Sequence, residues 1–311
     1  MPRLSVIGLE TTHGYIYPAM INGYDPAAMQ RNALEIVSGI FPTGGAPSVE
    51  GASFVACYDP DPERARQVAE ACMIERVCPD IADAYRGVDG VIIAAGDAAL
   101  HRELAAPALE AGLPTFVDKP FTATVEDAQA LIDLATARQV PLFCSSAIRF
   151  ADQTVTLRER LHESVGRPIA AHVMGTGDYA SYAVHSLEFL LSVWGSGVTG
   201  LQSLGKAGFD TVMLDFGNER RAVWQVCKEI DWRFHLAVYG TDGMDEATIV
   251  FADRYGLFRN TAAQIVRFMT TGESPVPLVD TLEIVRLLSL AEQHRGGEAI
   301  AVTAAPASSG R

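Results

Sequence analysis

The stretch that decides the fold of the N-terminal half is PTFVDKP, residues 114–120. Its apolar centre, Thr115–Val117, has the composition of a short buried strand, and Asp118, Lys119 and Pro120 follow directly. Lys119 is therefore a charged residue at the end of a buried strand. Three interpretations are open: a surface lysine, a lysine that only pairs with Asp118, or a catalytic cation beside a bound cofactor.

Similar apolar runs alternate with helical patterns along the first 150 residues. Strands are expected at Leu4–Gly8, Ser53–Tyr58, Asp89–Ala95, Thr115–Val117 and Val140–Ser145. Helices are expected after the turn at Thr11, and at Asp61–Ala71, Ala98–Ala111 and Val125–Arg138. This alternation predicts an α/β domain over residues 1–150 with a doubly wound parallel sheet of the Rossmann type. A proline- and glycine-rich insertion at about residues 22–52 is expected to form a helix and a loop.

Four residues fall at the carboxyl ends of the expected strands: Gly8, Asp59, Gly96 and Lys119. Parallel strands bring these ends to one edge of the sheet, and ligands of doubly wound sheets bind beyond that edge. The shared position favours the catalytic interpretation of Lys119.

The pattern changes after about residue 150. A strand at Ile169–Thr176 and a helix at Tyr179–Trp194 precede consecutive strands at Val198–Leu204, Asp210–Phe216, Arg220–Cys227, Phe234–Tyr239 and Glu246–Phe251, and then helices at Thr261–Thr271 and Thr281–His294. Strands without intervening helices predict an α+β domain over residues 151–311 with a large, mostly antiparallel open sheet. Because an open sheet must bury its apolar side, we expect a homodimer or homotetramer formed through this sheet.

Composition narrows the classes of function. The net charge of −14 opposes binding to nucleic acid or to an anionic membrane surface. No apolar run reaches the ~18 residues of a membrane span, and no secretory leader is apparent. Five cysteines, an odd number, fit no closed disulfide framework, which favours the cytoplasm. His162 and His172 have no partner at a metal-binding spacing, so no metal is expected.

The middle of the Rossmann domain resembles a known family. The run Val88–Ala94, His101, the stretch Ala108–Gly112 and the stretch Val117–Pro120 are similar to the Gfo/Idh/MocA oxidoreductases, which include glucose–fructose oxidoreductase and inositol dehydrogenase. The family motif is usually Glu-Lys-Pro, where this chain has Asp-Lys-Pro. The resemblance implies a Rossmann domain followed by a sheet domain with the substrate site. It also implies NAD(P)-dependent hydride transfer on a secondary alcohol of a sugar, polyol or related small molecule.

The glycine loop after the first strand departs from the usual dinucleotide fingerprint. Its G-x-G-x-x-G positions are Gly8, Glu10 and His13, so only the first glycine is present. A carboxylate at Glu10 repels a pyrophosphate unless it points away or binds a cation. We nevertheless place Gly8 and His13 among the candidate cofactor-binding residues, because helix N-termini offer N–H groups to phosphate.

Other cofactor contacts are expected around this loop. Thr11 and Thr12 can donate hydroxyl hydrogens to phosphate, or can simply cap the following helix. Asp59 can accept hydrogen bonds from the adenosine ribose, which favours NAD over NADP, or can belong only to a helix-entry turn. The resemblance places Gly96 and His101 in a loop over the nicotinamide, although His101 can also be a helix-surface residue.

The resemblance also implies the catalytic residues. It pairs Lys119 with a second-domain histidine, which matches His185. The family usually has an aspartate one helical turn before this histidine, where the chain has Ser181. Tyr182 and Asp178 are the candidates to replace it, and Tyr182 can also donate a proton or pack in the core.

Two further residues stand near this predicted site. Glu188, three residues after the histidine, can also orient it. Arg149 follows the last strand of the first domain and is a candidate substrate contact, with an interdomain salt bridge as the alternative.

The changes at Glu10 and Ser181 keep other functions open. One is a nucleotide-binding or regulatory protein on the same scaffold that has lost hydride transfer. Another is an enzyme that uses NAD transiently for elimination or hydrolysis.

Overall fold

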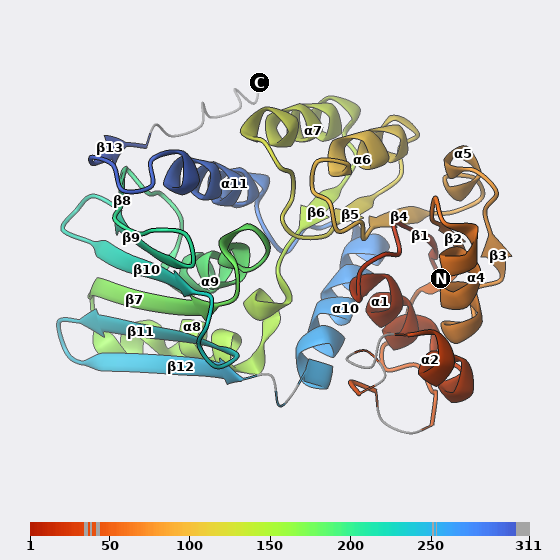
Figure 1. Cartoon of the computed structure of the whole chain (residues 1–311), viewed down its shortest axis with the longest axis horizontal. Helices are drawn as coiled ribbons and strands as arrows, with labels where there is room; N and C mark the ends of the chain where they lie inside the picture. The colour runs from red at the N-terminus through yellow and green to blue at the C-terminus, as the bar shows by residue number, and fades with distance from the viewer. Residues whose placement is uncertain (34–36, 38, 42–43, 251, 253, 303–311) are drawn as a thin grey trace. The chain divides into compact units, whose positions relative to one another are not determined.

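The computed structural model describes residues 1–33, 37, 39–41, 44–250, 252 and 254–302 (Figure 1). Contacts within the chain form two compact units, which comprise Met1–Ser145 with Arg254–Leu278, and Ser146–Asp253 with Val279–Arg311. The first unit therefore contains a segment that the sequence analysis assigns to the second domain. Predicted features at residues 34–36, 38, 42–43, 251 and 303–311 lie outside the described residues.

Aromatic packing explains why Arg254–Leu278 belongs to the first unit. The ring centroid of Phe258 lies 6.4 Å from that of Tyr17, and the ring centroid of Phe268 lies 5.4 Å from that of Phe143. Tyr17, Phe143 and Phe268 are fully or almost fully buried. A helix from the far end of the sequence thus supplies part of the Rossmann core.

The first unit has a six-stranded sheet in the order β3-β2-β1-β4-β5-β6, and every neighbouring pair described is parallel. The strands are β1 Arg3–Ile7, β2 Ser53–Tyr58, β3 Arg76–Val77, β4 Gly90–Ile93, β5 Thr115–Val117 and β6 Leu142–Cys144. The predicted doubly wound parallel sheet is confirmed, and its order brings the carboxyl ends of β1, β2, β4 and β5 to one edge.

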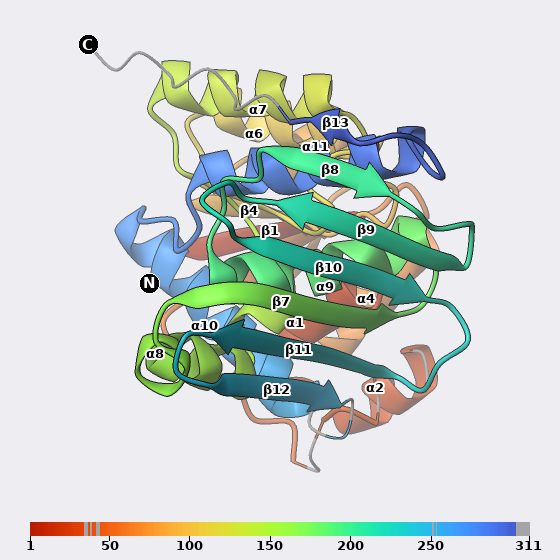
Figure 2. The same ribbon diagram turned by 90° about the vertical axis from the view of Figure 1, so that its left-hand side faces the viewer.

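Helices cover both faces of this sheet. They are α1 His13–Asn22, α2 Pro26–Asn32, α4 Pro62–Ala71, α5 Ile81–Ala84, α6 His101–Glu110, α7 Val125–Arg138 and α10 Arg254–Thr271. α6 packs with α7 on one side and α1 with α10 on the other (Figures 1 and 2). The predicted helix start at Asp61 is confirmed, because its side chain accepts hydrogen bonds from the N–H groups of Glu63 and Arg64.

The second unit has a seven-stranded sheet in the order β12-β11-β7-β10-β9-β8-β13 (Figure 2). Its strands are β7 Pro168–Thr176, β8 Gly200–Ser203, β9 Phe209–Asp215, β10 Arg221–Cys227, β11 Arg233–Gly240, β12 Met244–Val250 and β13 Ile300–Ala301. β7 and β10 are parallel, and the other described neighbours are antiparallel. The predicted α+β class with a mostly antiparallel sheet is confirmed.

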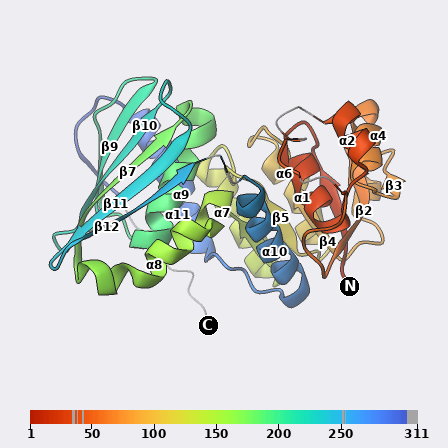
Figure 3. The ribbon, with the colours of Figure 1, turned by 90° about the horizontal axis from the view of Figure 1, so that it is seen from below.

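One face of this second sheet is packed and the other is open. The 3₁₀ helix η1 Ala147–Phe150 precedes α8 Asp152–Val165, α9 Tyr179–Trp194 and α11 Leu278–Gln293. α8 and α9 pack together against the sheet (Figure 3), where Val173, Trp224 and Leu236 are buried. Within the described residues of this unit, no helix covers the opposite face (Figure 2).

Candidate active site

The loop after β1 approaches the loop after β4 very closely. Gly8 has a φ of +78°, in the left-handed region that favours glycine. A Cβ atom at Gly8 would lie 2.7 Å from the Cα of Ala95. The first glycine of the fingerprint therefore permits close contact between the two loops that the sequence analysis assigns to the cofactor.

Two side chains of the first loop strengthen this contact. Glu10 Oε1 accepts a hydrogen bond from the Gly96 N–H at 2.5 Å, and Thr11 Oγ1 donates to the Ala94 carbonyl at 2.8 Å. Glu10 thus has a partner of its own in the second loop. Thr12 is the N-cap residue of α1, but its side chain makes no capping hydrogen bond among the described residues. Since the Thr11 hydroxyl bonds to Ala94, neither threonine side chain has the capping role considered above.

Asp59 is buried at the end of β2 and holds three donors. Its Oδ2 accepts from the Leu9 N–H at 2.7 Å. Its Oδ1 accepts from the Asp61 N–H at 2.8 Å and from Arg64 Nη1 at 2.9 Å. The carboxylate therefore joins the glycine loop to the start of α4. This agrees with the alternative in which Asp59 belongs to a helix-entry turn. The Asp59 side chain is completely buried in this arrangement.

A pocket of about 410 Å³ opens beside Asp59 at the carboxyl ends of β1 and β2. Its lining comes entirely from the first unit and consists of Ile7, Gly8, Glu10, Tyr58, Asp59, Pro60, Asp61, Arg64, Ala95, Leu100 and Leu104. Apolar walls with a few charged groups at this edge match the general character of a nucleotide site.

His13 is not among the residues that line this pocket, and it forms a buried pair with Asp118. The distance from His13 Nδ1 to Asp118 Oδ2 is 2.7 Å, and the two residues are 8% and 3% exposed. The imidazole packs edge-on against Phe258 and tilted against Tyr17. The sequence analysis considered Asp118 as a partner of Lys119 only, so this pairing is new.

The charge of Asp118 is stabilised by its neighbours. Burial opposes ionisation, but His13, through its charge and its hydrogen bond, holds the pKa of the Asp118 carboxyl below its usual value. Lys119 and His101 act in the same direction. Asp118 is therefore a buried carboxylate surrounded by cationic or ionisable groups.

Lys119 follows β5 as predicted, is partly exposed, and precedes Pro120 through a cis peptide bond. The His101 side chain is fully buried. Its two ring nitrogens face the Phe121 and Ala95 carbonyl oxygens at 3.0 and 2.8 Å. The alternative of a helix-surface histidine is therefore wrong.

In the second unit, His185 has a partner that the sequence analysis did not name. Its Nδ1 lies 2.6 Å from Ser146 Oγ, which also accepts a hydrogen bond from the Ile148 N–H at 3.2 Å. The His185 ring lies 5.7 Å from the ring of Phe234. Ser146 caps η1, 39 residues before His185, and no local pattern relates the two positions.

Asp178 and Tyr182, which were candidates to orient His185, make different contacts. Asp178 Oδ1 accepts from the Ser181 N–H at 3.1 Å and so caps α9. The Tyr182 ring lies 5.7 Å from His185 and packs edge-on against Trp232 at 4.7 Å. Burial, followed by the charge of Asp178, raises the pKa of the Tyr182 phenol, so this group keeps its proton near neutral pH.

Arg149 and Glu188 form a buried ion pair within the second unit. Arg149 Nε donates to Glu188 Oε2 at 2.5 Å, and Glu188 Oε1 accepts from the Ser146 N–H at 3.3 Å. Both side chains are less than a tenth exposed. This pair is the salt bridge considered for Arg149, since it joins the predicted domains 1–150 and 151–311, although both residues lie in the second compact unit. Glu188 also contacts Ser146, which bonds to His185.

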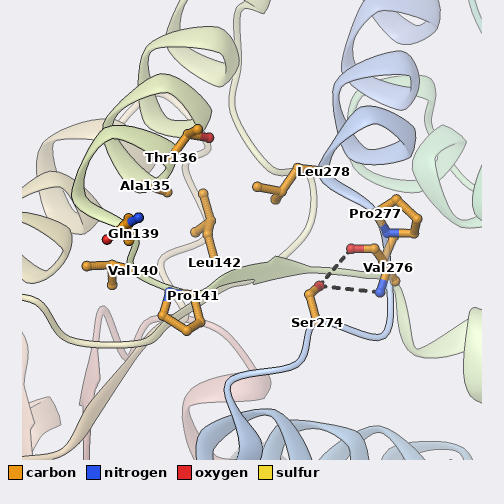
Figure 4. A pocket seen from close by; sticks show the side chains of 10 residues that line it. All are labelled: Ala135, Thr136, Gln139, Val140, Pro141, Leu142, Ser274, Val276, Pro277 and Leu278. Carbon is orange, nitrogen blue, oxygen red and sulfur yellow. Dashed lines mark hydrogen bonds between the residues drawn. The ribbon is translucent and has the colours of Figure 1, made fainter. Parts of the chain in front are cut away.

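A second pocket of about 410 Å³ lies elsewhere in the first unit (Figure 4). It is lined by residues of α7, β6 and the segment after α10: Ala135, Thr136, Gln139, Val140, Pro141, Leu142, Ser274, Val276, Pro277 and Leu278. The Ser274 hydroxyl bonds to the backbone of Val276 on its own loop. The lining is mainly apolar and contains no ionisable side chain, so it offers no acid–base chemistry.

No group of three or more His, Cys, Asp or Glu residues in the described part of the chain is arranged to hold a metal ion. No described helix has the length and apolar character needed to cross a membrane.

Comparison with known proteins identifies the Rossmann unit. Residues 45–146 match the model of the Gfo/Idh/MocA oxidoreductase family, described as having an NAD-binding Rossmann fold. The matched segment contains Asp59, Gly96, His101 and Lys119. The predicted resemblance to this family is confirmed for residues 45–146.

Curated relatives align with a part of the chain. The myo-inositol dehydrogenase Hyg17 of Streptomyces leeuwenhoekii is 32% identical over 111 residues, which are 35% of this chain and 34% of that protein. The D-apiose dehydrogenase of Paraburkholderia graminis is 32% identical over 130 residues, 41% of this chain and 32% of that protein. The chain thus spans about a third of the length of these curated relatives in the alignments.

Solved structures extend the likeness of fold to the whole chain. The myo-inositol dehydrogenase of Lactobacillus casei, in complex with NAD(H) and myo-inositol, has a TM-score of 0.78 at 15% identity, and the match covers 99% of both chains. An oxidoreductase from Agrobacterium radiobacter, in complex with NAD⁺, L-tartaric acid and magnesium, has a TM-score of 0.76 at 18% identity, covering 96% of this chain and 98% of that one. At these identities the likeness shows the two-part fold.

Proposed function

We propose that the chain is an NAD-dependent oxidoreductase that moves hydride between nicotinamide and a secondary alcohol of a cyclic polyol, sugar or related small molecule. The observation that carries this proposal is Lys119. It follows β5 at the same sheet edge as Gly8 and Asp59, inside the segment that matches the oxidoreductase family. A cation at that edge is suited to hold the charge of a reacting alkoxide.

The cofactor fits the residues present. The pocket beside Asp59 is proposed for the adenosine half, with Gly8 and the Thr11–Thr12 start of α1 for the pyrophosphate. When bound, NAD⁺ accepts the hydride at its nicotinamide ring. Gly96 is proposed to lie along the cofactor as well, since its loop is bonded to the glycine loop through Glu10.

The chain's own residues are proposed to handle the proton. Oxidation of CH–OH to C=O releases a hydride and a proton, and the proton needs a base. Lys119 lowers the pKa of the substrate hydroxyl, and His185 takes the proton, with its ring held by Ser146. Tyr182 is proposed as a hydrogen-bond donor to substrate, because its phenol stays protonated. We assign Asp178 to supporting α9 at its N-cap.

The first prediction concerns substrate class. Purified protein with NAD⁺ should reduce the cofactor in the presence of at least one member of a panel of inositols, apiose and other sugars, because the curated relatives act on such compounds by name. Absorbance of NADH at 340 nm measures the rate. If NADH binds but no panel member reacts, a regulatory nucleotide-binding protein is favoured. Product formation without net NADH indicates transient cofactor use.

The second prediction concerns the choice of cofactor. Asp59 and the more exposed Asp61 both line the pocket, and their carboxylates repel a 2′-phosphate, although Arg64 offsets part of this charge. We expect NADH to bind about tenfold more tightly than NADPH, which corresponds to ~1.4 kcal/mol. Titration of NADH and NADPH fluorescence measures both dissociation constants. Equal affinities would contradict the prediction.

The third prediction concerns assembly. We propose a homodimer or homotetramer formed through the open face of the second sheet, where His172, Gln225 and Thr211 form a hydrogen-bonded row between β7, β10 and β9. Tyr239 on β11 is 48% exposed. Sedimentation velocity at several concentrations should give at least twice the 33.4 kDa monomer mass. Gln225→Arg on this face should shift the protein toward monomer, whereas a monomeric parent would exclude the proposal.

We also propose that the protein works in the cytoplasm. The support is its five buried cysteines, an odd number that does not fit a closed disulfide framework.

A further inference from the structure

The backbone around Lys119 is anchored on both sides by buried histidines. On one side, Asp118 Oδ2 accepts a hydrogen bond from His13 Nδ1 at 2.7 Å. On the other side, the Phe121 carbonyl is 3.0 Å from His101 Nδ1. Lys119 and Pro120 are the only residues between these two anchored positions.

The His13 anchor leaves little freedom to Asp118. The Asp118 N–H donates to the Ile93 carbonyl at 2.8 Å, so the main chain is fixed to β4. Its Oδ1 is buried and has no hydrogen-bond partner among the described residues, so the carboxylate relies on His13 at Oδ2. The imidazole is itself confined between Tyr17 and Phe258. Loss of the hydrogen bond to His13 would therefore leave the Asp118 side chain without a fixed position.

Both ring nitrogens of His101 face hydrogen-bond acceptors. Both of its partners, Phe121 O and Ala95 O, are carbonyl oxygens, which only accept hydrogen bonds. A neutral imidazole has one N–H, so both bonds form together only when both ring nitrogens carry hydrogen.

The two histidines come from the two loops proposed to contact the cofactor. His13 is the first residue of α1, after the loop that begins at Gly8, and His101 is the first residue of α6, after the loop that contains Gly96. These loops are joined to each other by the hydrogen bond between Glu10 and Gly96. The Lys119 segment and both loops therefore form one hydrogen-bonded assembly within the first unit.

We propose that His13 and His101 are positioning residues for Lys119 rather than cofactor ligands. The inference rests on the proposed function, because it assumes that Lys119 is the reacting cation. His13 contacts Asp118 and His101 contacts Phe121, and these contacts hold the backbone that carries the Lys119 side chain. Because each histidine follows one of the two cofactor loops, the direction of the Lys119 side chain depends on the position of those loops.

The first test reads Lys119 directly and needs no substrate. The chain has three lysines, Lys119, Lys206 and Lys228, so reductive methylation with ¹³C-formaldehyde gives a simple lysine NMR spectrum. Lys119→Arg assigns the Lys119 signal. We expect His13→Leu to move that signal, while the other two lysine signals stay in place. An unchanged Lys119 signal in folded His13→Leu would overturn the proposal.

Tyr17→Phe is the matched control for this test. Tyr17 lies one turn after His13 on α1, and burial together with the Asp118 charge raises its pKa well above the usual value. Its hydroxyl has no hydrogen-bond partner among the described residues. Its removal should therefore leave the Lys119 signal unchanged. A shift as large as that of His13→Leu would show a general packing effect and contradict a specific role for the pair.

Once a substrate is known, the second test measures catalysis and NADH binding separately. His13→Leu and Asp118→Asn should each lower kcat by about a hundredfold through misplacement of Lys119, with the NADH dissociation constant changed by less than about threefold. The double variant should be no slower than either single variant, because the two residues act as a unit. Additive losses, or a loss confined to NADH affinity, would sink the proposal.

A conservative variant covers the case in which His13→Leu does not fold. His13→Gln keeps a donor for Asp118, so it should retain the parent Lys119 signal and most of kcat. If His13→Gln changes the Lys119 signal and kcat as much as a folded Asp118→Asn variant does, the assigned hydrogen bond is contradicted. If the parent turns over no alcohol, the proposed function fails, but the NMR comparison still decides whether His13 controls Lys119.

Discussion

Lys119→Met should abolish most turnover while leaving the cofactor bound. Methionine keeps the length and apolar part of the side chain but removes the charge that stabilises the alkoxide. Loss of such a preorganised group costs about a hundredfold to a thousandfold in kcat. Asp118 and its bond to His13 remain in place in this variant, so the fold around β5 should persist. Rates with the best alcohol of the panel, together with NADH titration, measure the two quantities.

Two comparisons make this result specific. Lys228→Met removes an exposed lysine from the turn after β10 and should keep the parent rate. Lys119→Arg retains a charge but replaces a compact ammonium by a wider planar group, so it should recover only part of the activity. A fully active Lys119→Met protein would remove Lys119 from the mechanism and leave the alcohol chemistry without its cation.

The Rossmann unit was largely predictable because its strands are short, apolar and bounded by polar or glycine residues. The predicted strand at Ser53–Tyr58 and the predicted helix at Val125–Arg138 have the same limits in the structure. Parallel pairing then placed Gly8, Asp59 and Lys119 at one edge without any knowledge of side-chain contacts. This logic depends only on the direction of the strands, which alternation with helices determines.

Elements with weaker local signals were missed. α8 is rich in charged residues, and its apolar stripe of Leu157, Leu161 and Val165 was not recognised, although the spacing of four residues is helical. β3 has two residues and exists because it pairs with β2. α10 begins at Arg254, seven residues before the predicted Thr261, because burial of Leu257 and Phe258 in the first unit extends it.

The partners of the site residues could not be predicted from the sequence. His13 and Asp118 are 105 residues apart, and Ser146 and His185 are 39 residues apart. No helical or strand period relates positions across different elements, so such pairs appear only when the chain is folded. Tyr182, Asp178 and Glu188 were predictable as partners of His185 because they lie on or next to the same helix, whereas Ser146 lies outside it.

The other large effect is expected for His185→Gln. Glutamine can still bond to Ser146 and fill much of the imidazole volume, but it cannot take a proton from the substrate. Loss of a general base costs about a hundredfold to ten-thousandfold, so kcat/KM should fall within that range. Binding of NADH, which is proposed to involve the first unit, should remain unchanged.

The pH profile separates a lost base from a damaged fold. In the parent, kcat/KM should decline at acid pH as His185 becomes protonated, and His185→Gln should lose this decline while its remaining rate is low at every pH. His162→Gln, at an exposed position on α8, should keep both the rate and the profile of the parent. Ser146→Ala should keep the acid decline but move its midpoint, because the hydroxyl contacts His185 Nδ1 and its removal changes the stability of the two protonation states. If His185→Gln retains the acid decline, the titrating base is another residue, and Tyr182, whose ring lies 5.7 Å from His185, becomes the next one to replace.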